Sequence, residues 1–379
     1  MQGAARYING KVTQFDQKNE GFKRPFWDPA MAGVRDKFYF AGVEPKKRPG
    51  YELKDQSAVN ASWLLDAQFA NGNNGGRQGL YNWEWDGVFN FPRVKKGFKT
   101  ADTDPSFLTL QVKKMSSFFG ASLAGVCQVD KRWVYSAAFI GDRGGGRSEP
   151  VNLPEECRYA IVLAFEMDYE AIGYSPAHPS SIAVGMAYSQ MAFTCGMLAQ
   201  FIRGLGFKAV PCGNDTALSI PLAIDAGLGE IARNGLLITP AFGPRVRLAK
   251  VFTDMPLVPD EPIEFGVWEF CRVCKKCALH CPSHSIEKGD ATGKIHNISN
   301  RPGVLKWNIN AETCLAWWAV NGTDCSNCIR ICPFNKPGGV FHDLVRFGIK
   351  RFKSLHSLFL WGDNFMGYGK RKRASGFWS

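Results

Sequence analysis

Eight of the twelve cysteines form two groups whose spacing suits metal–sulfur chemistry. In the first group the gaps are two, two and three residues, and a proline follows the last member: Cys271, Cys274, Cys277 and Cys281. In the second the gaps are ten, two and three residues, again with a proline after the last: Cys314, Cys325, Cys328 and Cys332. Closely spaced thiolates can hold three corners of a cubane iron–sulfur cluster, while the fourth ligand comes from elsewhere in the chain.

In two-cluster ferredoxins the last cysteine of each run binds the other cluster. That exchange predicts one [4Fe–4S] cluster on Cys271, Cys274, Cys277 and Cys332. It predicts a second on Cys281, Cys314, Cys325 and Cys328. Paired zinc sites also use four cysteines each, but they do not require a Cys-Pro ending in both motifs. The other four cysteines are interpreted as small buried apolar side chains: Cys127, Cys157, Cys195 and Cys212.

Two clusters alone transfer electrons, and about 60–65 residues suffice for such a module. The chain has 379 residues and 45% hydrophobic content, which is enough for a second, larger core. Three classes therefore compete: a reductase that uses a corrinoid or flavin, a tRNA-modifying reductase, and an electron carrier.

The formal net charge of +12 suggests an acidic partner, such as nucleic acid or an anionic membrane surface. The basic residues are scattered, and the densest run, 370–373, is interpreted as a solvated tail. No stretch has 18 consecutive apolar residues, so no transmembrane helix is expected. The N-terminus shows no apolar signal region. We therefore expect a cytoplasmic protein, or an exported one whose signal has been removed.

Strand and helix patterns alternate between about 100 and 260, which indicates an α/β or α+β fold. Helices are expected at 57–70 and at 222–233. Another should follow Asp104 as its cap, with Pro105 as its first residue, and a long helix should run from a cap at Ser180 to about 205. Strands are expected at 123–129, 207–212, 236–239 and 245–252. The nearly continuous apolar run 158–167 predicts a buried strand.

The stretch 225–247, which reads DAGLGEIARNGLLITPAFGPRVR, resembles the reductive dehalogenases, the corrinoid and iron–sulfur enzymes of organohalide respiration. The resemblance continues through VFTDMPL at 251–257, both cysteine motifs, FHDL at 341–344 and the glycines of 362–369. It covers the chain from about residue 105 to the end.

This resemblance implies a nitroreductase-like corrinoid-binding domain followed by a bacterial ferredoxin-like module with two clusters. The implied organisation is an aromatic-rich segment covering the pocket at 1–100, the corrinoid domain at 101–265, the cluster module at 266–338, and an extension packing on the core at 339–379.

It also implies that a tyrosine, an asparagine and an arginine crowd the substrate side of the cobalt. By motif these are Tyr188, Asn214 and Arg247. Reductive removal of halide needs electrons at carbon and then a proton, which a tyrosine can supply if its phenolate is stabilised. A guanidinium does this and stays charged, and an asparagine amide can donate a hydrogen bond to the tyrosine or the halide.

The corrinoid follows from the family alone, since no motif in the sequence shows it. The Asp-x-His-x-x-Gly pattern that gives cobalt a histidine in some corrinoid enzymes is absent. A bound corrinoid is therefore expected in its base-off form. Gly227 and Gly229 could let the backbone approach its tail, or could serve a turn. Trp318 could face the corrin ring, or pack around a cluster.

Epoxyqueuosine reductase, which acts on a tRNA base, resembles the same stretch and also uses a corrinoid. That family has an acid near the position of Asn214, so Asp215 keeps this alternative open. The tyrosine and arginine favour dehalogenation, and nucleic acid is not the favoured partner. A flavin-dependent iron–sulfur reductase also fits the nitroreductase-like domain.

The family also implies partners and a location. The substrate would be a small chlorinated or brominated hydrocarbon, and an alkene, an alkane and an aryl halide all fit. The enzyme would lie at the outer face of the cytoplasmic membrane, held by a small membrane-anchor subunit and supplied by an upstream electron donor. A homodimer is compatible with this arrangement.

Overall fold

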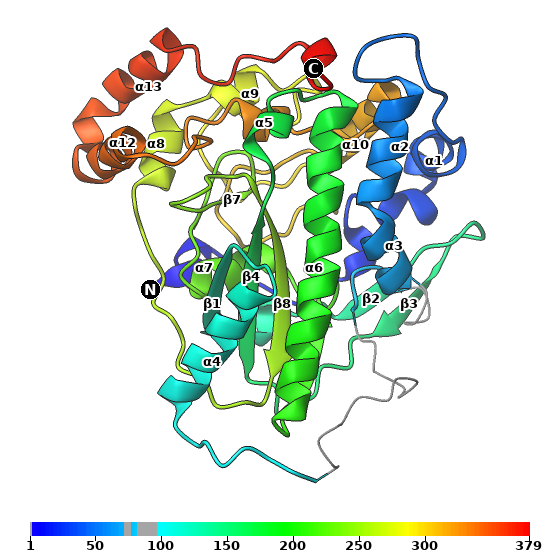
Figure 1. Ribbon diagram of the computed structural model, residues 1–379. Coiled ribbons are helices and arrows are strands. Elements are labelled where there is room, and N and C mark those ends of the chain that lie inside the picture. Colours follow the sequence, from blue (N-terminus) through cyan, green and yellow to red (C-terminus); the bar gives the residue numbers. More distant parts are fainter. Residues whose placement is uncertain (1, 72–76, 82–96) are drawn as a thin grey trace.

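The computed structural model describes residues 2–71, 77–81 and 97–379 (Figure 1). Its main sheet has the strand order β1-β4-β8-β5. These strands are β1 (Leu123–Gln128), β4 (Tyr159–Glu166), β8 (Val246–Thr253) and β5 (Ala209–Cys212). Every neighbouring pair is antiparallel, so the predicted mixed fold is of the α+β kind.

Strand β4 is buried on both faces, because successive side chains of a strand point to opposite sides. Ile161, Leu163 and Phe165 pack into one hydrophobic core. Their alternates, Ala160, Val162 and Ala164, pack into the other. This double burial explains the continuous apolar run at 158–167 and confirms the predicted buried strand.

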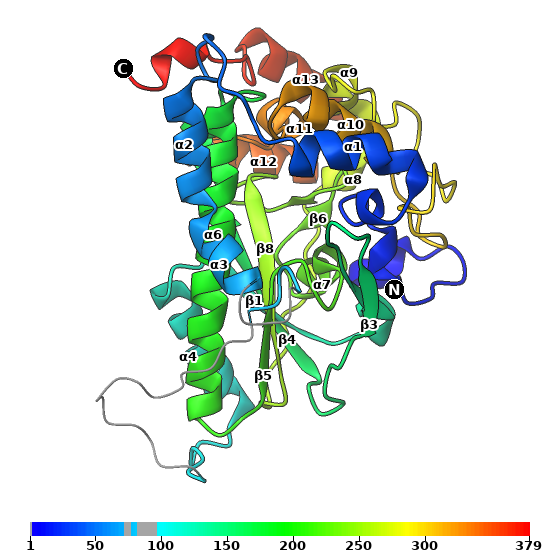
Figure 2. The ribbon, with the colours of Figure 1, turned by 90° about the vertical axis from the view of Figure 1, so that its right-hand side faces the viewer.

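Helices cover the two faces of the sheet. Helices α6 (His178–Gly204) and α4 (Pro105–Phe118) lie on one face, and α7 (Ser219–Asp225) lies on the other (Figure 1). Helices α2 (Leu53–Ser62) and α3 (Leu64–Asn71) run beside α6 (Figure 2). By length and composition α6 could cross a membrane, but 67% of its most apolar window is buried inside the protein. It is the central helix of the core.

Three predicted helices differ in the structure. The helix expected at 57–70 begins earlier and is split at Trp63, which caps the end of α2. Ser180 is not the cap of α6. The helix begins two residues earlier, and the Ser180 hydroxyl donates to the Ala177 carbonyl. The helix expected at 222–233 begins earlier and ends at Asp225, so its second half is wrong, because Gly227 adopts a φ of +70° and closes α7.

After α7 the chain forms a short hairpin of β6 (Glu230–Ile231) and β7 (Leu237–Ile238). A second hairpin joins β2 (Ala137–Ile140) to β3 (Arg147–Pro150). The predicted strands at 123–129, 207–212, 236–239 and 245–252 are confirmed, with ends that differ by up to two residues.

The C-terminal third wraps the end of this core in short helices: α8 (Val267–Val273), α9 (Lys276–Leu279), α10 (Ala311–Asn321), α11 (Asn327–Arg330), α12 (Val340–Arg351) and α13 (His356–Phe365). The predicted module 266–338 begins at the N-cap of α8 and ends before α12. Segments from the N-terminal hundred residues lie along it, including α1 (Ala32–Arg35), which contacts α10 (Figure 2).

Candidate active site and cluster sites

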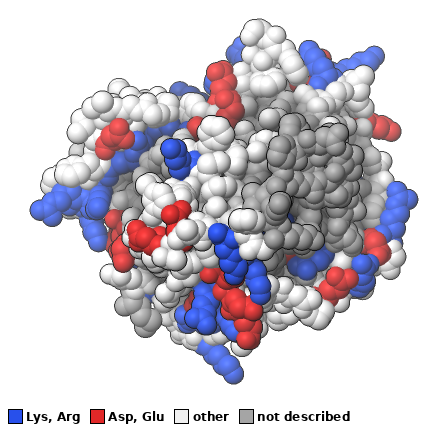
Figure 3. Space-filling view, turned by 60° about the horizontal axis from the view of Figure 1, so that its bottom comes forward, with Lys and Arg blue, Asp and Glu red and all other residues white. Residues whose placement is uncertain are grey.

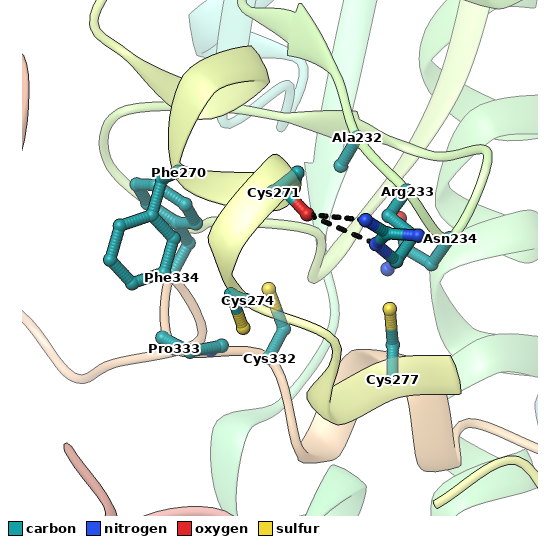
Figure 4. A pocket seen from close by; sticks show the side chains of 10 residues that line it. All are labelled: Ala232, Arg233, Asn234, Phe270, Cys271, Cys274, Cys277, Cys332, Pro333 and Phe334. Carbon is teal, nitrogen blue, oxygen red and sulfur yellow. Dashed lines mark hydrogen bonds between the residues drawn. The ribbon is translucent and has the colours of Figure 1, made fainter. Parts of the chain in front are cut away.

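The first predicted cysteine set surrounds one cavity. Cys271 and Cys274 come from α8 and its C-cap, Cys277 from α9, and Cys332 from the segment after α11. Figure 4 shows the sulfurs of Cys274, Cys277 and Cys332 around a common space. No three His, Cys, Asp or Glu side chains in the described residues could hold a single metal ion. The four cysteines line one cavity, with Phe270 and Phe334 as apolar walls.

Arg233, which the sequence pattern predicts to lie in a helix, instead fixes one side of this cavity. Its guanidinium is fully buried and donates through Nε and Nη2 to the Cys271 carbonyl at 3.0 and 2.8 Å (Figure 4). Its Nη1 donates to the carbonyls of Glu287 and Gly289 at 2.7 Å each. Arg233 therefore ties α8 to the 287–289 segment and holds a cation beside the cysteines.

Two further buried cations lie near the same group. The ammonium groups of Lys276 and Lys336 share the carboxylate of Asp363 on α13, and all three side chains are less than 10% exposed. Burial raises the pKa of both Cys274 and Cys332, and the positive charges of Lys276 beside the first and Lys336 beside the second oppose that rise. The first cysteine group thus lies in a positive field.

The second predicted set is also brought together. Cys314 lies on α10, where burial and then the neighbouring Cys325 and Cys281 raise its pKa. Burial likewise raises the pKa of Cys328 on α11, and the same three cysteines add to that rise. Around this group the sulfurs accept hydrogen bonds from uncharged backbone amides. The Ser285 amide donates to the Cys281 sulfur at 3.4 Å, and the Asn327 amide donates to the Cys325 sulfur at 3.5 Å.

The chemistry of these donors suits clusters. Burial raises the pKa of Cys325 to about 11 and that of Cys314 to about 12, so both thiols are neutral at pH 7. Iron binds thiolates, so loading a cluster must displace these protons. A cluster would thereby exchange buried neutral thiols for coordinated thiolates.

Tyr188, Asn214 and Arg247 come together from three elements. Tyr188 lies on α6, Asn214 on the loop between β5 and α7, and Arg247 on β8. The Asn214 amide donates to the Tyr188 hydroxyl at 2.8 Å. The Arg247 guanidinium carbon lies 5.3 Å from the centre of the Tyr188 ring. The structure therefore assembles the trio that the family resemblance implies.

Trp63, the residue that caps the end of α2, positions the tyrosine. Its ring stacks on that of Tyr188 with centroids 4.6 Å apart. Gly185, one turn earlier on α6, makes this approach possible, since a Cβ there would lie 2.5 Å from the Trp63 ring. The break between α2 and α3 thus places an aromatic wall against the tyrosine.

Lys250, which is not among the residues predicted for the site, anchors the loop that carries Asn214. Its fully buried ammonium donates to the Gly213 carbonyl, to the Ala217 carbonyl at 2.7 Å and to the Ser219 hydroxyl at 3.0 Å. These acceptors bracket Asn214 on both sides. A lysine inside the apolar strand 248–252 is the signal that could have identified it.

Asp215, the acid that keeps the tRNA-modifying alternative open, is bound by residues outside the trio. It is 1% exposed, forms an ion pair with Arg77 and accepts a hydrogen bond from Thr216 at 2.7 Å. Its carboxylate is therefore satisfied by Arg77 and by its own loop.

Three buried donors from these sites have no hydrogen-bond partner among the described residues: Arg247 Nε, Ser326 Oγ and Trp318 Nε1. Arg247 belongs to the trio, whereas Ser326 follows Cys325 and Trp318 lies on the helix of Cys314. Unsatisfied buried donors commonly mark the place of a ligand or a water molecule.

The other predicted corrinoid contacts have explanations within the chain. A Cβ at Gly229 would lie 1.9 Å from the Ile238 carbonyl oxygen, and one at Gly227 would lie 2.6 Å from that of Glu261. Close backbone packing thus accounts for both glycines, and their contact with a corrinoid stays a prediction. Trp318 packs on Phe22 and Phe38, with ring centroids 5.3 and 6.1 Å away.

Comparison with known proteins identifies the cluster domain and the family. The family model of the 4Fe-4S dicluster domain matches residues 270–336. The tetrachloroethene reductive dehalogenase of Sulfurospirillum multivorans is 31% identical over 420 residues, covering 99% of this chain and 83% of that enzyme. The chain belongs to the reductive dehalogenases.

Other reductive dehalogenases are longer. The tetrachloroethene enzyme of Desulfitobacterium hafniense is 40% identical over 304 residues, which are 71% of this chain and 55% of that enzyme. A solved reductive dehalogenase, for which a B12-dependent mechanism was suggested, shares the fold with a TM-score of 0.71 and 21% identity. The match covers all of this chain and 49% of that one, so the present chain spans about half the length of these relatives.

The tRNA-modifying alternative is a more distant match. The epoxyqueuosine reductase of Bacillus subtilis is 32% identical over 132 residues, only 31% of this chain. On the face shown in Figure 3, basic and acidic side chains are interspersed, unlike the basic stripe that tracks a nucleic-acid backbone.

Proposed function

We propose that this reductive dehalogenase replaces a carbon-bound halogen of a small chlorinated or brominated hydrocarbon with hydrogen. The dehalogenases of Desulfitobacterium hafniense and Sulfurospirillum multivorans, which match 71% and 99% of this chain, carry tetrachloroethene in their names, so tetrachloroethene is the first substrate to test. The observation that carries the proposal is the meeting of Tyr188, Asn214 and Arg247 from three separate elements.

The reaction consumes two electrons and one proton and releases halide. Tyr188 donates the proton from its hydroxyl group. Asn214 orients that hydroxyl through its amide, and Arg247 stabilises the phenolate because its guanidinium stays charged. The stacked Trp63 ring excludes water from one side of the tyrosine.

The two cysteine groups of the dicluster domain would hold two [4Fe–4S] clusters, which would supply electrons to this site. A bound corrinoid would supply cobalt-centred reduction of the carbon–halogen bond. The N–H and O–H groups of Arg247, Trp318 and Ser326 that have no partner among the described residues are the groups we assign to its binding. Family membership is the support for a location at the outer face of the cytoplasmic membrane, with a small anchor subunit and a separate electron donor.

The test is anaerobic purification with corrinoid present, followed by assays of iron, cobalt and chloride release from tetrachloroethene. We expect about eight irons and one cobalt per chain. Tyr188→Phe should lower turnover at least about 100-fold and leave both metals bound, because only the proton donor is lost. Tyr159→Phe, a similar change on β4, serves as the control.

Iron without cobalt and without chloride release would contradict the proposal and favour the flavin-dependent reductase or the electron carrier. Full turnover in Tyr188→Phe would leave the dehalogenase assignment standing and remove the tyrosine as its proton donor.

A further inference from the structure

The N-terminal segment 14–20 lies against the β2–β3 hairpin, outside the motifs that carry the family resemblance (Figure 2). Its backbone joins that hairpin, because the Ser136 amide donates to the Phe15 carbonyl at 3.0 Å. The short 3-10 helix η2 (Gln17–Asn19) follows, and Gln17 is 1% exposed. The polar atoms of its side chain must therefore find their partners inside the protein.

Both ends of the Gln17 side chain are hydrogen-bonded. Its Nε2 donates to the Asn214 carbonyl at 3.1 Å, and its Oε1 accepts from the Phe139 amide at 2.9 Å. A backbone carbonyl can only accept and a backbone amide can only donate, so the side-chain amide fits in one orientation. Gln17 therefore links β2 to the main chain of the residue whose side chain binds Tyr188.

The loop around Asn214 depends on such bonds. Gly213 precedes Asn214, and glycine restrains its own backbone less than any other residue. Thr216 adopts a φ of +69°, in the left-handed region that β-branched residues disfavour. Asn214 itself is exposed, so packing contributes little to holding its side chain. The direction of its amide toward Tyr188 therefore follows from how the backbone of 213–216 is held.

We infer that Gln17 is a positioning residue of the dehalogenation site and acts through Asn214. Its bond to the Asn214 carbonyl fixes the peptide plane that follows Asn214, and with it the direction in which the side-chain amide donates to the Tyr188 hydroxyl. The inference rests on the proposed function, because it assigns Gln17 to the step in which Tyr188 gives up its proton. The N-terminal segment then contributes to the reaction step as well.

Gln17 and Lys250 hold different atoms of the same loop. The Lys250 ammonium donates to the carbonyls of Gly213 and Ala217, on either side of Asn214. Gln17 donates to the Asn214 carbonyl itself. Loss of Gln17 should therefore turn one peptide group while the bonds of Lys250 keep the rest of the loop in place.

The first test is Gln17→Met, which keeps the length of the side chain and removes both hydrogen bonds. We expect kcat for chloride release to fall at least about fivefold with KM within about twofold, because the geometry of the proton donor is lost. Iron and cobalt contents should match those of the unchanged chain. The matched control is Gln14→Met. Gln14 is exposed and also donates through Nε2 to a carbonyl, that of Lys131 at 3.2 Å, and its loss should leave turnover unchanged.

Gln17→Asn guards against a loss of the fold in the first variant. Its side chain stays polar but is one carbon shorter, so it cannot bridge the Phe139 amide and the Asn214 carbonyl together. It should lower kcat by a similar factor with a smaller drop in melting temperature than Gln17→Met, because fewer buried groups lose a partner.

A double-mutant cycle separates positioning from a general structural role. If Gln17 acts through Asn214, Gln17→Met should change the turnover of an Asn214→Ala chain by less than about twofold. A general structural effect would lower turnover by the same factor in both backgrounds.

Hydrogen exchange of the backbone amides at 213–217 tests the bond without turnover. Exchange should be faster in Gln17→Met and Gln17→Asn than in the unchanged chain, and unaltered in Gln14→Met. The inference is overturned by unaltered exchange in both Gln17 variants, by full kcat in both, by a rise in KM alone, or by equal losses in the two backgrounds of the cycle. If the unchanged chain releases no halide, the proposed function fails, and exchange alone still decides whether Gln17 holds the loop.

Discussion

The first cysteine group and the Tyr188 site both contain buried lysines, but the groups that bind these lysines differ between the two sites. At the first cysteine group Lys276 and Lys336 share the carboxylate of Asp363. At the Tyr188 site, within the described part of the chain, Lys250 donates only to uncharged oxygens of the loop around Asn214.

The difference separates two uses of buried charge. Two lysines against one carboxylate leave net positive charge beside thiolates that a cluster makes negative, so that arrangement tunes an electron site. Lys250 bonds backbone carbonyls on both sides of one residue, so it fixes geometry instead. Four changes test this contrast, and the expected effects decrease in the order given.

The largest effect should follow the loss of a cluster ligand. Cys332→Ala should remove the first cluster, although Cys332 lies in the second motif, and iron should fall from about eight to about four per chain. Cys271→Ala must then lose the same electron paramagnetic resonance signal, while Cys281→Ala and Cys325→Ala must lose the other. Cys195→Ala, a buried cysteine of the main core, should keep all the iron. Loss of the Cys325 signal in Cys332→Ala would disprove the exchanged ligation.

Asp363→Asn should be the next most severe change. It leaves two buried ammonium groups without their carboxylate, which should lower the free energy of unfolding by about 3–5 kcal/mol. The added net positive charge should also raise the reduction potential of the first cluster and leave that of the second unchanged, as measured by redox titration. Asp343→Asn on α12, where an exposed carboxylate pairs with Arg346, should cost at most about 1 kcal/mol. Equal shifts of both clusters would show that Asp363 does not act locally.

Lys250→Met should act on the trio and spare the clusters. Removing three hydrogen bonds to buried acceptors should cost about 3 kcal/mol in thermal unfolding. Because the Asn214 loop loses its anchor, turnover should fall at least about tenfold while the iron content stays constant. Lys208→Met removes a half-exposed lysine paired with Glu156 and should change stability by less than about 1 kcal/mol. Unchanged turnover in Lys250→Met would mean that the loop keeps its position without the lysine.

The cysteine groups can be predicted from the sequence more directly than the trio. Thiolate spacing is local, so gaps of two and three residues already restrict which sulfurs can share a cluster. Tyr188, Asn214 and Arg247 lie far apart in the sequence and meet only because α6 crosses the sheet beside β8. Family resemblance, and no spacing rule, points to them.

The site residues that the sequence does not reveal share one property. Arg233 and Lys250 are charged side chains fully buried by tertiary packing, and each bonds to carbonyls of segments distant in sequence. Propensity also misleads at 222–233, where an apolar helical pattern continues past Gly227 although the backbone there turns with positive φ. Local sequence signals predict strand β4 and helix α6, whereas the positions of Arg233 and Lys250 depend on polar contacts between segments distant in the sequence.

The smallest effect concerns Asp66 on α3, whose backbone amide donates to Ser189 beside Tyr188. Burial raises the pKa of Asp66 to about 6, and the Tyr81 hydroxyl bond opposes this only in part. Because the unfolded value is about 3.9, the folded chain binds more protons between the two values. The free energy of unfolding should therefore fall as pH rises from about 4 to about 6.

Asp66→Asn keeps an oxygen for Tyr81 and cannot ionise. The substitution should remove the decrease in the free energy of unfolding between about pH 4 and about pH 6. It should raise that free energy at pH 7 by about 1–3 kcal/mol, as measured by urea unfolding across this pH range. Parallel curves for the two proteins would mean that the folded chain ionises Asp66 without cost. The Tyr188 region would then tolerate a buried carboxylate that has no ion-pair partner in the described part of the chain, and its difference from the first cysteine group would rest on Lys250 alone.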